Sequence, residues 1–150
     1  MNEPSEALRN WLESNYTLAA EDVSVDDVKF TTVDYNTDRS PQCPHIVTQL
    51  SGFRRIQEGE PSLYEFSFVV QISVFQTWRK PQSDIAELTA LYWAIVNHIK
   101  VVCDSFNVGD ITGWQSVWVD SGTNTGILIG TIPDEFVFTL GVKAVVGWTS

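Results

Sequence analysis

Apolar and polar residues alternate over two long stretches of the chain. From residue 63 to 78, apolar side chains at every second position are separated mainly by polar ones, and residues 135–148 repeat the pattern. A period of two gives a strand one apolar face and one polar face, so both stretches predict long strands of a half-buried sheet. At about 3.3 Å per residue the first would reach roughly 50 Å, so we expect it to bend or to project past the core as a hairpin arm whose far end is the Arg79–Lys80 tip.

Two other segments have the apolar spacing of helices. Residues 4–14 begin with a proline, which suits a first turn, and predict a short docking helix whose apolar face is formed by Leu8, Trp11 and Leu12. Residues 81–104 begin with a capping-box-like pattern and predict one long helix. Its apolar stripe is expected to consist of Ile85, Leu88, Tyr92, Ile95, Ile99 and Val102.

The remaining apolar runs predict shorter strands. Residues 23–35 suggest a strand of uncertain register, and "HIVTQLSGF" predicts a second strand that ends near Gly52 and is followed by a polar loop. "WQSVWV" and "ILIGT" predict two more strands near the C-terminus. We therefore expect residues 1–150 to form a single α+β domain: a mainly antiparallel sheet with long strands, packed by one long helix and a short N-terminal helix.

Charge narrows the range of functions. The chain carries a formal net charge of −10, and acidic residues predominate between residues 3 and 38. Nucleic-acid binding requires clustered Lys and Arg, so a surface that wraps DNA is not expected.

Basic residues occur as two pairs in this acidic chain. The pairs are Arg54 with Arg55 and Arg79 with Lys80. Each pair either belongs to a solvated face or forms a contact between subunits, and in the second case a basic tip would meet the acidic patch of a neighbouring subunit. The subunit-contact hypothesis includes Trp78, which precedes the second pair.

Segments that would target the chain to a membrane or for secretion are not predicted. The N-terminal "MNEPSEALRNW" lacks a basic region and an apolar run, and no window approaches the length of a membrane span. The sequence predicts a soluble protein made in a cytoplasm. Cys43 and Cys103 are expected to be free thiols, with Cys103 buried.

One short motif is compatible with catalysis. Asp120-Ser121-Gly122 resembles the Asp-Thr/Ser-Gly signature of aspartic proteases, in which two carboxylates share a proton and activate water. A dimer could supply the second copy, but only residues 123–126 precede the following apolar segment, which leaves no room for a flap. The motif is also a common turn, so a dimeric protease around Asp120 is the minor alternative.

Metal and phosphate sites are not predicted. His98 and Cys103 are five positions apart on the predicted helix, which separates them by about 140°, so a surface histidine and a buried cysteine are expected. Cys43 and His45 are spaced as a possible ligand pair, but His98 and Cys103 cannot readily share one ion. The glycines at positions 122, 126 and 130 are not followed by the Lys-Ser/Thr of a phosphate loop.

Tryptophan is unusually frequent, with six residues in the chain. Core packing, a protein interface and a sugar-binding platform all use tryptophan. Trp93 on the long helix is expected in the core or at its edge, and Trp78 and Trp148 are expected at the ends of the two long strands.

The order of predicted elements resembles that of a known family. The chain is predicted to begin with a helix in "EPSEALRNWLESN", followed by a strand near "HIVTQLSGF", a long alternating strand, a long helix in "RKPQSDIAELTALYWAIVNHIK" and closing strands. This order resembles that of the tail terminator, or tail-completion, proteins of long-tailed phages and related viruses. The resemblance covers nearly the whole chain but is one of length and element order. Neck proteins that join the tail to the head have a similar layout and remain an alternative.

The resemblance implies a structural virion protein of the tail or neck, assembled in the host cytoplasm. Such a protein forms a homohexameric ring that caps the tail tube, ends its polymerisation and contacts the head connector protein. The family implies no catalysis, cofactor or bound metal. DNA would only pass through the channel, and an acidic lumen would let it slide because like charges repel.

Overall fold

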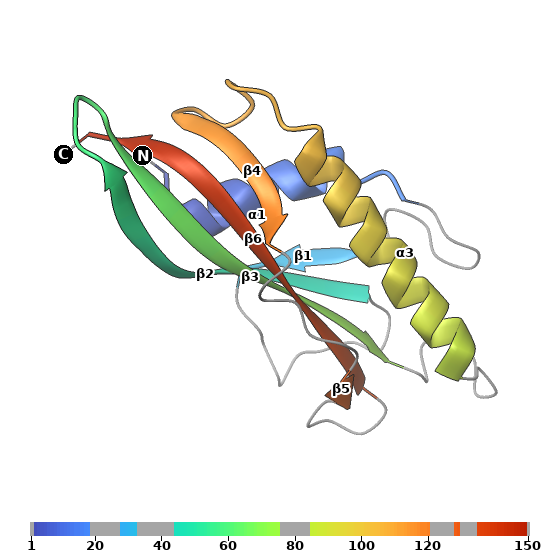
Figure 1. The fold of residues 1–150 in the computed structure, drawn as a ribbon. Coiled ribbons are helices and arrows are strands. Elements are labelled where there is room, and N and C mark those ends of the chain that lie inside the picture. Colours follow the sequence, from blue (N-terminus) through green and yellow to red (C-terminus); the bar gives the residue numbers. More distant parts are fainter. Residues whose placement is uncertain are drawn as a thin grey trace.

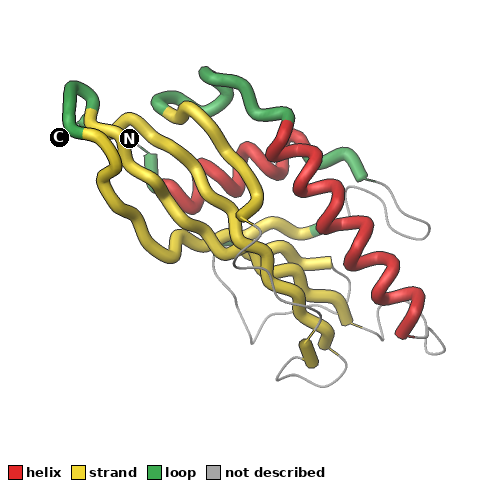
Figure 2. Tube along the Cα trace, viewed as in Figure 1, coloured by secondary structure: helices red, strands yellow, loops and turns green. Residues whose placement is uncertain are grey.

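A computed structural model describes residues 2–18, 28–32, 44–75, 85–120, 128–129 and 135–149 (Figures 1 and 2). The described elements, in chain order, are α1 (Pro4–Asn15), β1 (Lys29–Thr31), β2 (Pro44–Gln57), β3 (Ser62–Phe75), α3 (Ile85–Asp104), β4 (Trp114–Asp120), β5 (Leu128–Ile129) and β6 (Glu135–Trp148). They form a single α+β domain, as the sequence predicted.

Helix α1 starts where its backbone donors find a side-chain partner. The carboxylate of Glu3 accepts hydrogen bonds from the backbone N–H groups of Ser5 (3.0 Å) and Glu6 (2.9 Å), and Pro4 occupies the first turn. The predicted apolar face is buried, and the hydroxyl of Ser5 accepts a hydrogen bond from the N–H of Leu50 in β2. This bond places the first turn of α1 beside the middle of β2.

The strands lie in the order β1-β2-β3-β6-β4, with β5 paired to β6. Strands β2, β3, β6 and β4 pair antiparallel, whereas β1 pairs parallel to β2, so the sheet is mixed at one edge. Phe66 lies opposite Ala144 and Val70 opposite Leu140, which places the even-numbered apolar residues of β3 and β6 on one face. This face is called the core face, and the opposite one the outer face.

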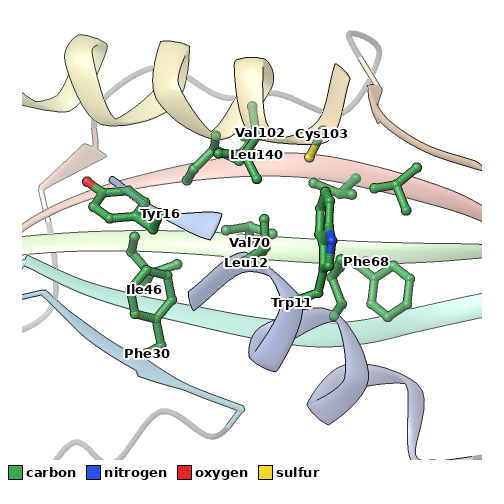
Figure 3. Close-up of a cluster of buried hydrophobic side chains, with 14 of the residues drawn as sticks. Trp11, Leu12, Tyr16, Phe30, Ile46, Phe68, Val70, Val102, Cys103 and Leu140 are labelled. Atoms are coloured by element: carbon green, nitrogen blue, oxygen red, sulfur yellow. The ribbon is translucent and has the colours of Figure 1, made fainter. Parts of the chain in front are cut away.

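The hydrophobic core fills the space between the core face and the two helices (Figure 3). Ile95, Ile99 and Val102 of α3 pack in the same buried cluster as Leu8 and Leu12 of α1. The predicted stripe of α3 is therefore confirmed over its C-terminal half, and the side chains at positions 85, 88 and 92 lie outside the described residues.

The prediction for Trp93 was wrong. Its side chain is 61% exposed, whereas Leu91 on the same helix is buried. Trp93 precedes the buried Ile95 by two positions, which places it about 200° around the helix and away from the sheet.

The predicted end of the second strand was also wrong. Strand β2 continues past Gly52 to Gln57, and its pairing with β3 shifts between Leu50 and Gly52. Such a bulge lets a strand bend without ending. Because the bulge changes the phase, Phe53 lies opposite Phe66 and occupies the core face like Leu50.

Candidate assembly surface on the hairpin arm

The hairpin formed by β2 and β3 continues past the helix-covered part of the sheet. In β2, residues 44–48 are buried, whereas residues 53–57 are all exposed. We call the hairpin segment from Gly52 to Phe66 the arm. Figure 1 shows its tip beside the C-terminus, at the end of the sheet away from the start of α3. The arm predicted from strand length was a different one, with its far end at Arg79 and Lys80, and these two residues lie outside the described part of the chain. The β2–β3 turn lies at the opposite end of β3.

Three aromatic side chains cluster on the core face of this arm. Phe53, Tyr64 and Trp148, here called the arm patch, have ring centroids 5.1–6.2 Å apart. Phe66 lies buried beneath them, 5.7 Å from Phe53. Phe53 is 55% exposed and Trp148 is 37% exposed, so the patch presents a large apolar surface to solvent. Exposed aromatic clusters of this kind typically mark interaction sites.

Close backbone packing holds Trp148 in place. The N–H of Gly147 donates a 2.8 Å hydrogen bond to the carbonyl of Gly113, which has φ of +86° and so requires glycine-like freedom. A Cβ at Gly147 would lie 3.0 Å from Cγ of Pro61, in the turn between β2 and β3. The turn, the start of β4 and the end of β6 therefore meet at Gly147, which fixes the base of the arm patch.

A hollow of about 360 Å³ lies next to the patch. Its lining includes Arg55, Glu60, Ser62, Tyr64 and Trp148. One aromatic wall and a polar rim suit the insertion of a side chain from a partner protein.

Arg54 and Arg55 lie on the arm, as neighbours on opposite faces of the strand. The Nε atom of Arg54 lies 3.3 Å from the carboxylate of Glu65, and Arg55 contacts Glu58 at 2.8 Å. Both arginines remain at least half exposed. The other three residues of the subunit-contact hypothesis, Trp78, Arg79 and Lys80, lie outside the described residues.

Asp120 takes part in a chain of charges on the outer face. Lys143 lies 3.4 Å from the carboxylate of Glu65 and 3.7 Å from that of Asp120. The carboxylates of Asp120 and Glu65 therefore lie on the same cation, the ammonium group of Lys143. Ser121 and Gly122, the rest of the protease-like motif, lie outside the described residues.

The histidines and the described cysteine occupy separate places. His45 is 4% exposed on β2 and its Nε2 lies 2.7 Å from Oγ1 of Thr31, whereas Nε2 of His98 on α3 accepts a hydrogen bond from the N–H of Thr17. Cys103 is buried, as predicted. Over the residues that the structure describes, no three His, Cys, Asp or Glu side chains come together as a metal site. Cys43 lies outside that part.

Burial causes the main pKa shifts among the described residues. Desolvation raises the pKa of the Tyr16 hydroxyl and of the Cys103 thiol to about 12 each, and it lowers the pKa of His98. Tyr16 and His98 touch edge to face at 4.9 Å, whereas Cys103 lies in the core cluster. These groups stabilise the packing of the helices and do not line the hollow on the arm.

Sequence reasoning did not single out Phe53 or Tyr64. The available signal was Phe53 itself, an aromatic residue directly before "RRIQEGEPS", where a polar loop was expected. Aromatic side chains dominate the energetics of protein interfaces, so an aromatic residue in an otherwise polar segment is a candidate contact.

Comparison with known proteins gives no identification, because no family model and no curated protein sequence matches the chain. None of the helices in the described ranges is long and apolar enough to cross a bilayer.

Proposed function

We propose that this protein is a non-enzymatic structural protein of a virus tail, which assembles with copies of itself into a closed ring. In this proposal the ring caps the tail tube, ends its polymerisation and joins it to the head connector protein. The order of the elements resembles that of tail terminators, and the sheet with two helices on one face is compatible with that layout.

The arm patch is the observation that carries the proposal. Phe53 and Trp148 lie next to each other in this patch and are both exposed, which is unfavourable for a monomer because contiguous apolar patches promote association. The rings meet at interplanar angles of 60–73°, so their edges and faces form an uneven surface. Such a surface suits interlocking with protein side chains better than flat stacking on a sugar ring.

A ring of identical subunits requires a contact between two different surfaces of the chain. In the described part of the chain, β1 pairs only with His45–Val47, so past Gly52 the strand β2 forms an edge of the sheet that a neighbour can reach. The net charge of −10 is compatible with a channel through which DNA passes without binding.

Molar mass in solution tests the self-assembly. Light scattering after size-exclusion chromatography should give a mass near six times the 16.9 kDa chain, and electron micrographs should show rings with a central hole. The variant F53T/W148T should shift the mass towards one chain while its far-ultraviolet circular dichroism stays that of the wild type. A wild-type monomer across the micromolar range would contradict the proposed ring.

A tube-capping assay tests where in the virion the protein acts. Added to polymerising tail-tube protein encoded in the same genome, the ring should stop growth and appear at one end of each tube. Binding to the connector without any effect on tube length would instead indicate a neighbouring neck protein.

The enzymatic alternative has its own test. If the protein were a dimeric aspartic protease, D120N would abolish peptide cleavage at acidic pH. Under the proposed function, D120N and wild type give the same assembly and no cleavage.

A further inference from the structure

The sheet has an edge strand on each side. Over the residues that the structure describes, β2 pairs only with β3 beyond Gly52, and β4 pairs only with β6. The two strands lie at opposite sides of the sheet (Figure 1). The outward backbone N–H and C=O groups of an edge strand can pair with a strand of another chain.

The two edge strands run in opposite directions. Strand β2 is antiparallel to β3, β3 to β6 and β6 to β4, so β4 is antiparallel to β2. A second copy that is related to the first by rotation about an axis along the strands keeps these directions. Its β2 placed beside the first copy's β4 therefore makes one more antiparallel pair, and the same step can be repeated around a ring.

A row of charges crosses the outer face from one edge to the other. Its members lie on successive strands and alternate in sign: Arg54, Glu65, Lys143 and Asp120. Successive charged groups are 3.3, 3.4 and 3.7 Å apart. The row gives the β2 edge a cation and the β4 edge an anion. A β4–β2 junction between copies continues the alternation, whereas two β2 edges would bring like charges together.

The end members of this row can hold partners in two chains. Oε1 of Glu65 lies 3.3 Å from Arg54 and 3.4 Å from Lys143, so one carboxylate of the row already binds two cations. The carboxylate of Asp120 can do the same, because an ionised carboxyl group has about four acceptor positions. Arg54 reaches Glu65 through Nε, and its side chain is 73% exposed. Its terminal nitrogens contact no carboxylate of the described residues.

We propose that the β2 edge of one copy, Gly52–Gln57, pairs antiparallel with the β4 edge of the next copy, and that this junction repeats around the ring. The inference rests on the proposed self-assembly and identifies the two strands that meet. Each subunit contributes one edge of each kind, so the contact is head-to-tail, as a ring requires.

Charge fixes the register of the junction. With Arg54 opposite Trp118 of the neighbour, residues 52–57 pair with residues 115–120. Asp120 then lies two positions from Arg54 along the strands, the diagonal offset at which it meets Lys143 within the chain.

The same register gives the arm patch an apolar cover. It places Phe53, which is 55% exposed, opposite Val119 of the neighbour, and both side chains lie on the core face. The junction therefore accounts for part of the exposed aromatic surface as well as for the charges.

Cross-linking tests the junction in the full chain. Q57C and Q115C, each in a C43S background, place one thiol at an exposed position of each edge, while Cys103 stays buried. With a short bismaleimide, neither variant alone should form covalent dimers, and an equal mixture should form dimers and nothing larger. The double variant Q57C/Q115C should form a ladder of up to six chains. The control V108C, at a position that is 77% exposed in the loop after α3, should not cross-link to Q57C.

Charge reversal tests the row. R54E and D120K should each weaken the association several-fold, and R54E/D120K should recover most of it, because the two charges at the junction are exchanged. D120N is not informative here, since its amide oxygen still accepts from Arg54. The control E13K matches D120K in charge but lies on α1, and it should assemble like the wild type. Each variant should retain the wild-type circular dichroism.

The outcomes separate the junction from the ring. If the wild type is monomeric, both are wrong. If the wild type assembles but the mixture of Q57C and Q115C gives no covalent dimer, the ring stands and its contact lies elsewhere. Covalent dimers of Q57C alone would show that two β2 edges meet, which overturns the head-to-tail junction. If R54E/D120K associates as weakly as the single variants, the two charges do not meet and the register is wrong.

Discussion

The backbone N–H of Thr17 donates a hydrogen bond to Nε2 of His98, with 2.9 Å between the nitrogen atoms. The residues are 81 positions apart in sequence, so this bond ties the segment after α1 to α3. Nε2 can accept only while the ring is neutral. Burial favours that state, because it lowers the pKa of His98 below its ordinary value of 6.5.

Stability should therefore decrease on acidification. The unfolded chain takes up a proton near pH 6.5, whereas folded His98 resists protonation, so its contribution is full above pH 6.5 and is lost as the pH falls below it. The expected loss is about 0.5–1 kcal/mol, the net value of one hydrogen bond at a partly exposed site. The free energy of unfolding, measured by urea denaturation from pH 8 to 5, checks this.

The matched control is H98Q, whose amide oxygen can accept the same N–H without titrating. Subtracting its pH profile removes the contributions of every other titrating group. Parallel profiles for wild type and H98Q would show that His98 does not supply the pH dependence.

Glycine at position 147 should be required for stability. A Cβ there meets Cγ of Pro61 at 3.0 Å, so G147A requires the Pro61 ring to shift by a few tenths of an ångström against the turn between β2 and β3. Overpacking of this kind costs about 1–3 kcal/mol. Thermal unfolding followed by circular dichroism should show a lower midpoint for G147A. The control is G52A, where a Cβ meets nothing within 4 Å and where alanine should be neutral or slightly stabilising. Equal midpoints for G147A and wild type would contradict the close packing.

Cys103 should be nearly inert in the folded protein. Its thiol is buried, and desolvation raises its pKa to about 12, so only about 10⁻⁴ of it is thiolate at pH 8. In a C43S background, which isolates this thiol, alkylation by iodoacetamide should be at least about 100-fold slower in buffer than in guanidinium chloride. Mass spectrometry of timed samples measures both rates. Rapid alkylation in buffer would show that this part of the core opens readily.

The sequence predicted the helices and strands that have one face in the core and the other face in solvent. Strands β3 and β6 lie under the helices, so their alternation survives along most of their length. Past Gly52, β2 is exposed on both faces, so Arg54 and Arg55 follow each other without any apolar period. The bulge near Gly52 also shifts which residues of β2 face the core. Because the residues after it are polar and include a glycine, the sequence pattern there predicts a loop. The parallel pairing of β1 was beyond prediction, because three residues carry no period.

The candidate site was only partly predictable for the same reason. Basic pairs are visible in sequence as charge, and Arg54 and Arg55 do lie on the arm. The arm patch, in contrast, joins Phe53, Tyr64 and Trp148 from three strands, and only strand register brings them together. Trp93 shows a second limit of prediction from sequence. The spacing of apolar residues predicts that a helix forms, but when a helix has few polar residues the spacing does not show which of its sides faces water.

Arg79 and Lys80, the second basic pair, should take part in assembly through charge. Their position after the long β3 stretch and the acidic character of residues 3–38 favour a contact between unlike charges of neighbouring subunits. R79E/K80E should therefore lower the molar mass at low salt, and the difference from wild type should shrink towards 1 M salt, where the Debye length falls to about 3 Å. The control K100E reverses a charge on α3, away from the arm, that already has a partner in its own chain, Asp104, and it should assemble like the wild type. If R79E/K80E assembles like the wild type at low salt, this pair is a solvated face and the ring closes through other contacts.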